Sequence, residues 1–395
     1  METERTFQRR ARGHGHRASV FSILALLGLL APGGGWLRAQ TATPVEPPEP
    51  EIPPKISLWQ PFFNARAGTG YKDNVLLSPL NPSGSGLHFT ELEATLVRLP
   101  ADGTQLNLYA LGTDKRYWRS GLMDKEQTAL ALAQIKRDFS ARWQGGLTAQ
   151  YLYHDQVFDV STTEQAITTV QAQANALVAR PELRRELSGP WWAELELELT
   201  RYEFIAPLDD YWEGGPRAAV AREYGHQSEF SLAVQYRQRA YDSREQVSLA
   251  GLVLPGQALR LNEYEAEMAL RHNWDAARRW RGALRLTLSR EEDNGPGYFD
   301  HWRWQATGQM EYRGQAWLVR ARARGAVTSY SHQPVSLVNL ETRERFSFSA
   351  SLRAERKLGK YWRALAEYEQ ELASSNRPLD GYRVNTVWAG LEWEY

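Results

Sequence analysis

The chain has 395 residues, with 47 basic and 47 acidic side chains, 15 tryptophans, 18 tyrosines and no cysteine. The balanced charge argues against a nucleic-acid partner, and the lack of cysteine excludes a disulfide framework or a cysteine-ligated metal. A negative mean hydropathy with abundant aromatic residues is typical of a membrane β-barrel, which has a polar interior and aromatic girdles outside.

The first segment is basic and then apolar. Arginines within positions 5–17 precede an apolar run over residues 20–31, and Ala39 supplies a small residue for cleavage. The run is shorter than the roughly 18–20 residues that a membrane-spanning helix needs. Residues 1–39 are therefore predicted to be a secretory signal peptide, and residues 40–55 a Pro-rich periplasmic linker.

From residue 56 onward, apolar and polar residues alternate with a period of two. Residues 191–202 read WWAELELELTRY, residues 263–270 read EYEAEMAL, and residues 317–324 read WLVRARAR. Successive side chains of a strand point to opposite faces, so each segment is predicted to form a strand with one apolar and one charged face.

The lengths of the segments and of their connections distinguish a membrane barrel from a soluble sandwich. Soluble strands usually run about 5–6 residues, whereas these segments are longer and suit a bilayer. Short turns near residues 100–103, 188–190, 313–314 and 358–360 alternate with longer connections over 72–87, 158–168, 205–216, 242–260, 293–300 and 330–342. Short periplasmic turns and longer outer loops are the expected asymmetry of an outer-membrane barrel.

Residues 56–395 are therefore predicted to form an all-β, transmembrane, antiparallel up-and-down β-barrel of about 16 strands, with about 14 or 18 left open. The predicted strands are 56–70, 88–99, 104–117, 127–138, 144–157, 169–185, 191–204, 217–224, 228–241, 261–273, 280–292, 301–313, 315–329, 343–357, 361–374 and 382–395.

The chain ends in VWAGLEWEY, an amphipathic strand with alternating aromatic residues. Gly390, Trp393 and Tyr395 resemble the C-terminal assembly signal of outer-membrane proteins. Such a strand can be captured by edge pairing and must then close against the first strand, since an open edge in lipid leaves backbone groups unpaired. The expected partners are the barrel-assembly machinery, outer-membrane lipid and lipopolysaccharide.

Two further segments carry a family resemblance. Residues 68–75 (GTGYKDNV), with Pro79 after them, resemble the Gly-Tyr-Asp-x-Asn-Val…Pro element of a broad group of barrels. This group includes barrels linked to exopolysaccharide and capsule loci and the barrel domains of surface-lipoprotein assembly modifiers. Lys72 stands where the group usually has Asp, and residues 368–385 resemble its penultimate loop and final strand. Assembly modifiers carry a helical repeat domain where this chain has a Pro-rich linker. The resemblance implies an outer-membrane location and a role in moving polymer or protein.

Rows of like charge are predicted to line the barrel interior. The candidates are Glu194, Glu196, Glu198, Glu263, Glu265, Glu267, Arg285, Arg320, Arg322 and Arg324. Acidic and basic arcs that face each other across a lumen select and orient polar solutes. The same rows can instead pair with one another and hold the wall rigid.

Tryptophans at strand ends are predicted to form the interface girdles: Trp59, Trp118, Trp191, Trp274, Trp280, Trp302 and Trp362. Trp192, Trp304 and Trp388 fall on polar faces, where they could stack on sugar rings or simply pack.

The function predicted first is a channel that passes polar solutes or a surface polysaccharide. A non-conducting barrel for surface display or envelope assembly is the alternative, and a barrel-embedded lipid hydrolase is a second one. No Ser–His element, metal spacing, dinucleotide fingerprint or phosphate loop is recognisable, so neither catalysis nor a cofactor is predicted.

Overall fold

A computed structural model describes residues 57–100, 102–118, 123–160, 169–205, 208–336, 338–377 and 380–395. The predicted signal peptide and linker lie outside these residues. Ile56–Tyr395 form one compact unit. Among the described residues, no helix is long and apolar enough to cross a membrane.

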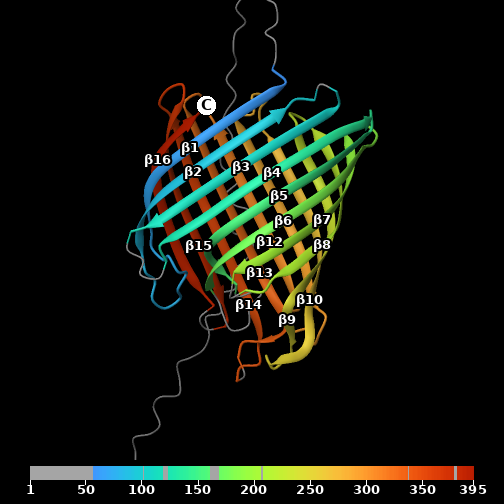
Figure 1. Cartoon of the computed structure of the whole chain (residues 1–395), viewed down its shortest axis with the longest axis vertical. Helices are drawn as coiled ribbons and strands as arrows, with labels where there is room; N and C mark the ends of the chain where they lie inside the picture. Colours follow the sequence, from blue (N-terminus) through green and yellow to red (C-terminus); the bar gives the residue numbers. More distant parts are fainter. Residues whose placement is uncertain are drawn as a thin grey trace, which may run out of the picture. The chain divides into compact units, whose positions relative to one another are not determined.

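The described residues form sixteen antiparallel strands in one closed barrel, as predicted (Figure 1). The strands are β1 (Trp59–Lys72), β2 (Ser85–Arg98), β3 (Thr104–Tyr117), β4 (Lys125–Ser140), β5 (Trp143–Asp159), β6 (Thr169–Glu186), β7 (Trp191–Ile205), β8 (Tyr211–Tyr224), β9 (Ser228–Val247), β10 (Val253–Asn273), β11 (Trp280–Asp293), β12 (His301–Arg313), β13 (Trp317–Pro334), β14 (Thr342–Lys357), β15 (Trp362–Ser375) and β16 (Tyr382–Glu394).

Each strand pairs with its neighbours in sequence, and β1 closes the barrel against β16 from Asn64↔Glu394 to Lys72↔Thr386. Closure gives every strand two partners, which a sheet in lipid requires because bare backbone groups there are costly. Inside this seam, the Arg66 guanidinium lies between Glu392, at 2.8 Å, and Glu91.

Two connections are shorter than the sequence predicts. The region 242–260 is predicted to be a loop, but β9 and β10 continue as a hairpin to Val247 and Val253. Likewise, β8 begins at Tyr211 and not at residue 217. Both corrections have one cause: strand pairing continues into polar and glycine-containing sequence when the neighbouring strand offers its hydrogen-bonding groups.

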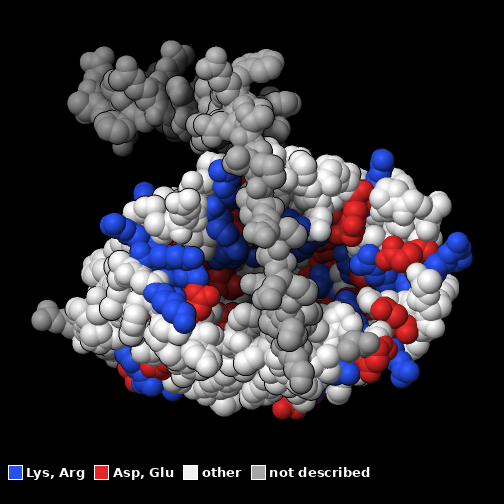
Figure 2. Space-filling model, turned by 90° about the horizontal axis from the view of Figure 1, so that it is seen from above, with Lys and Arg blue, Asp and Glu red and all other residues white. Residues whose placement is uncertain are grey.

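The exposed leucine, valine and tryptophan side chains of the strands lie on the outward face of the wall. On β7, for example, Leu195, Leu197 and Leu199 are 40–56% exposed, whereas the intervening glutamates point inward. Figure 2 shows the same division, with mostly uncharged residues on the outer wall and charged side chains within the hollow. The period-two alternation in the sequence therefore separates a lipid-facing surface from a polar interior.

Candidate functional site

The charged residues predicted to line the interior all lie at inward positions of their strands. They occupy four strands: Glu194, Glu196 and Glu198 on β7; Glu263, Glu265 and Glu267 on β10; Arg285 on β11; and Arg320, Arg322 and Arg324 on β13. Whether they line an open path stays a prediction.

The acidic row on β7 is largely paired with arginines of the two neighbouring strands. Glu198 accepts a 2.8 Å hydrogen bond from Arg180, and Glu194 lies 3.6 Å from Arg217. Glu196 lies opposite Arg217 in the strand register. The carboxylates therefore hold β6, β7 and β8 together through charge as well as through the backbone.

The acidic row on β10 is paired in the same way. Its ion pairs are Glu263–Arg237 at 2.7 Å, Glu265–Arg237 at 3.5 Å, Glu267–Arg217 at 3.3 Å and Glu267–Arg285 at 3.2 Å. Arg217 thus bridges acids from both rows. For these two rows the structure supports wall-stabilising pairing.

The arginine row on β13 has different neighbours. Arg320 pairs with Glu311 at 2.8 Å. Among the described residues, however, Arg322 and Arg324 donate only to the amide oxygens of Gln309 and Gln305, at 3.2 and 2.7 Å. On the other side, the strand register places only serines opposite these two arginines. Neither arginine forms an ion pair with any residue in the described part of the chain.

A third arginine, missed by the sequence analysis, extends this positive region. Arg303 on β12 points inward, makes no ion pair with a described residue, and its Nε has no hydrogen-bond partner among them. Arg303 and Arg345 both lie opposite Thr328 in the register, one on each side. Arg303 stands alone in the segment HWRWQATG, so no repeating charge row in the sequence marks it.

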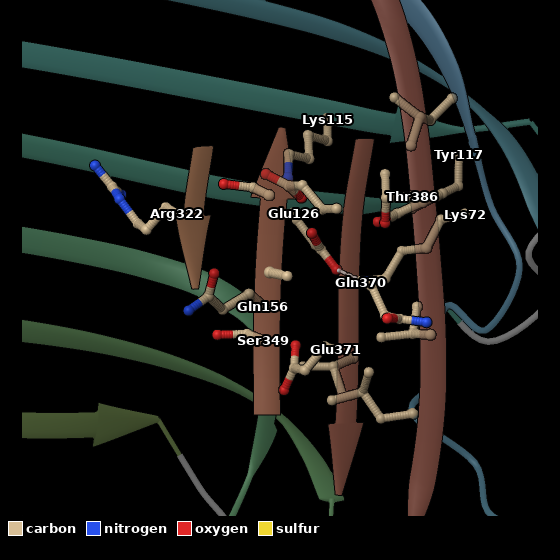
Figure 3. A pocket seen from close by; sticks show the side chains of 17 residues that line it. Lys72, Lys115, Tyr117, Glu126, Gln156, Arg322, Ser349, Gln370, Glu371 and Thr386 are labelled. Atoms are coloured by element: carbon tan, nitrogen blue, oxygen red, sulfur yellow. Dashed lines mark hydrogen bonds and ion pairs between the residues drawn. The ribbon is translucent and has the colours of Figure 1, made fainter. Parts of the chain in front are cut away.

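The interior contains a cavity of about 370 Å³ that residues from widely separated strands line (Figure 3). Arg322 and Ser349 reach it from β13 and β14, and Lys115, Glu126 and Gln156 reach it from β3, β4 and β5. Because β5 and β13 are not neighbours in the barrel, the cavity occupies the lumen between opposing parts of the wall.

The lumen is also crossed by direct contacts. Arg345 on β14 forms an ion pair with Asp159 on β5, although the two strands are far apart in the barrel order. In the β1–β2 connection, Val75 is 2% exposed and packs in an inward cluster with Phe89 and Trp388. These contacts occupy part of the interior, which in an empty barrel of this size is wide enough for an aqueous channel.

The three tryptophans predicted to lie on polar faces differ in position. Trp192 and Trp388 point inward, where Arg184 stacks on Trp192 at 4.1 Å and Phe89 packs on Trp388 at 4.4 Å. Trp304 was assigned to the wrong face: it is 61% exposed on the outward face of β12. The error arises because Arg303 and Gln305, and not Trp304, occupy the inward positions of β12.

All seven tryptophans predicted for the girdles are exposed near strand ends: Trp59, Trp118, Trp191, Trp274, Trp280, Trp302 and Trp362. Indole rings favour the membrane–water interface because they combine a large apolar surface with one N–H donor. These tryptophans lie at both ends of the barrel, on either side of an apolar outer face. A closed wall with this surface fits a lipid bilayer. The chain is an outer-membrane β-barrel.

The chain is similar to several solved structures, at low sequence identity. No protein-family model matches the chain, and no curated protein matches it. Among solved structures, OccK9 of Pseudomonas aeruginosa is 9% identical, with a TM-score of 0.48, and the match covers 85% of this chain and 98% of that one. A BenF-like porin from Pseudomonas fluorescens is 8% identical, with a TM-score of 0.46 and coverage of 85% and 99%. A loop-deletion mutant of OmpT from Vibrio cholerae is 8% identical, with a TM-score of 0.41 and coverage of 86% and 100%.

The residues of the predicted assembly signal lie at the barrel seam. Trp393 faces outward and packs against Phe63 of β1, with 5.7 Å between ring centroids, and Tyr395 is 69% exposed beside it. Gly390 lies opposite Gly68, and a Cβ at Gly390 would collide with the carbonyl oxygen of Ala67. Glycine at this position therefore allows β16 to approach β1. Recognition by an assembly machinery stays a prediction.

One serine–histidine contact bears on the hydrolase alternative. Ser228 Oγ lies 3.4 Å from His272 Nδ1, but Ser228 is fully buried and its Oγ accepts a hydrogen bond from the Asn273 backbone N–H. A nucleophile must be reachable by substrate, so this pair is a structural contact. In the described residues, no group of three or more His, Asp or Glu side chains is arranged to hold a metal ion.

Proposed function

We propose that this barrel is a channel for small polar solutes, with charge selectivity set by Arg322 and Arg324. The observation that carries the proposal is the contrast within the lumen wall. Most carboxylates of the acidic rows have arginine partners, whereas these two arginines face the interior with neutral amides as their only partners among the described residues.

Pairing decides how far a charge acts. The field of an ion pair falls off rapidly with distance, because its two charges cancel when seen from far away. Arg322 and Arg324 have no such cancelling partner among the described residues, so they produce a positive potential along one side of the lumen. A positive lining attracts anions and repels cations, and we expect the open channel to prefer anions.

The interior favours small solutes over a polymer. The cavity beside Arg322 has a volume of about 370 Å³, and the Arg345–Asp159 pair crosses the lumen. A polysaccharide passing lengthwise would need these contacts to open. The role in polysaccharide export that the sequence resemblance implies therefore stays a second substrate hypothesis.

The test is single-channel recording of the purified full-length protein in a planar bilayer under a salt gradient. We expect discrete openings with an anion-selective reversal potential, shifted toward cations in the double variant R322Q/R324Q. The matched control is R290Q, because Arg290 lies on β11 at an outward position, where it stacks on Trp302. Open channels whose selectivity is equal in wild type and the double variant would overturn the assignment of these arginines.

A non-conducting barrel is the second candidate, and a specific observation favours it. The β1–β2 connection packs inside the barrel and the Arg345–Asp159 pair spans it, so these contacts could close the lumen. A folded, heat-modifiable protein that never conducts, either as wild type or as D159N, would favour this candidate and exclude the channel.

A further inference from the structure

Tryptophan and arginine are paired repeatedly at the short-turn end of the barrel. At three places, the tryptophan that begins an odd-numbered strand lies opposite an arginine near the end of the next strand. The pairs are Trp143–Arg185, Trp191–Arg222 and Trp317–Arg356, with the guanidinium carbon 5.1, 5.6 and 5.5 Å from the ring centroid.

All three pairs lie on the outward face of the wall. The tryptophans are 38–48% exposed, and the arginines are also exposed. Tryptophan in this position marks the level of the lipid headgroups. Each guanidinium is therefore held over an indole ring at the boundary between lipid and water.

No described residue neutralises the guanidinium groups of these pairs. Arg185, Arg222 and Arg356 form no ion pair and no side-chain hydrogen bond with any residue in the described ranges. At the same rim, Arg98 lies opposite Trp59, but Asp102 accepts a hydrogen bond from it at 3.2 Å.

The opposite end of the barrel has the same stacking with the charge compensated. Arg201 stacks on Trp212 at 5.4 Å and Arg290 on Trp302 at 5.3 Å. Asp242 lies 2.7 Å from Arg201, and Glu292 lies 2.5 Å from Arg290. Stacking on tryptophan therefore does not by itself require a bare guanidinium, and the missing acid at the short-turn rim needs a separate explanation.

We infer that the three short-turn Trp–Arg pairs are binding sites for the headgroups of anionic phospholipids. A guanidinium donates paired hydrogen bonds to phosphate oxygens, and the indole below it packs on the glycerol and upper acyl region. The negative lipid supplies the charge that the protein supplies itself at Arg98, Arg201 and Arg290. In an outer membrane the short turns face the periplasm, so the bound lipid belongs to the periplasmic leaflet.

The experiment compares the retention of two lipids by the full-length protein. Protein in detergent is mixed with phosphatidylglycerol or phosphatidylcholine carrying identical acyl chains, and bound lipids are counted by native mass spectrometry. Wild type should retain phosphatidylglycerol preferentially. A basic side chain near an anionic surface contributes about fivefold in affinity. The triple variant R185Q/R222Q/R356Q should therefore weaken retention about fivefold, and each single variant should lose the preferential binding at its own site only.

Two controls separate headgroup binding from general loss of charge. R98Q removes an arginine at the same rim, and R201Q removes a tryptophan-stacked arginine at the other end; both should retain phosphatidylglycerol like wild type. Heat-modifiable migration confirms the folding of each variant, and the single variants are measured beside the triple one. Equal retention of the two lipids by wild type would overturn the inference, as would equal losses in the rim and control variants.

Discussion

The acidic rows on β7 and β10 and the arginine row on β13 share one sequence pattern, a like charge at every second position. On β7 and β10 the neighbouring strands present arginines, so most of the row is consumed in pairing. On β13 the neighbours are glutamine, threonine and serine, except at Arg320. The same sequence pattern therefore forms ion pairs across the wall on β7 and β10 but leaves net positive charge on β13. The residues of the neighbouring strands determine the difference.

The largest effect is expected in a buried charge network at the barrel seam. Glu392 is 1% exposed and accepts hydrogen bonds from Arg66 at 2.8 Å and Arg353 at 3.4 Å. Removing one partner from a buried charge network costs about 3–5 kcal/mol, because the remaining charges lose their compensation. We expect E392Q to lower the free energy of unfolding by about 3 kcal/mol, measured by urea unfolding of the barrel in lipid vesicles.

The control for that substitution lies on the same strand. The Glu394 side chain is 42% exposed and pairs only with Arg363 among the described residues. A pair this exposed contributes about 0–1 kcal/mol, so E394Q should unfold near the wild-type midpoint. Equal midpoints for E392Q and E394Q would contradict the role given to burial.

Arg217 tests the acidic rows themselves. Its side chain is 23% exposed and joins Glu194 of β7 to Glu267 of β10. We expect R217Q to destabilise the barrel by about 1–2 kcal/mol, since Glu194 then loses its ion pair and Glu267 keeps only Arg285 among the described residues. R271Q is the comparison, because the Arg271 side chain is 61% exposed and forms an ion pair only with Glu229 among the described residues. If R271Q destabilises as much as R217Q, the bridge has no special role.

Substitutions in the arginine row should leave the free energy of unfolding almost unchanged. Replacing Arg322 and Arg324 removes no ion pair from the described structure, so R322Q/R324Q should change the free energy of unfolding by less than about 0.5 kcal/mol. The same double variant should shift the reversal potential. A variant that unfolds much more easily than wild type would show that the row supports the wall after all.

The smallest effect is expected at an exposed pair in a turn. Between β10 and β11, the Arg279 side chain donates a 2.8 Å hydrogen bond to Asp275, and this bond lowers the pKa of that carboxyl. A depressed pKa contributes stability above the unfolded-state value of about 3.9, and this stability is lost as pH falls through the folded value. We expect the Asp275 carboxyl to titrate below that value in NMR spectra and to return toward it in R279Q. An unshifted titration in wild type would contradict the hydrogen bond.

The sequence predicted the alternation well and the partners poorly. A period of two fixes which side chains share a face, so the inward rows and the girdle tryptophans could be identified from residue order alone. The register between strands could not be identified from residue order. The sequence therefore did not show that Glu267 pairs with Arg285, or that Arg324 pairs with no acid among the described residues. The length of β8 and the β9–β10 hairpin were missed because strand pairing extends beyond the apolar segments.

What the amino-acid sequence determined by itself is a series of long strands, each with one apolar and one polar face, because alternation needs only the geometry of the extended backbone. Their lengths and the alternation of short and long connections are typical of a membrane barrel. What the tertiary structure decided is the character of the interior. The Asp159–Arg345 contact joins residues 186 positions apart in the sequence. The cavity beside Arg322 is lined by strands from both the beginning and the end of the chain's barrel segment. Such contacts exist only once β1 has paired with β16, because closure alone brings distant parts of the wall to face each other across one lumen.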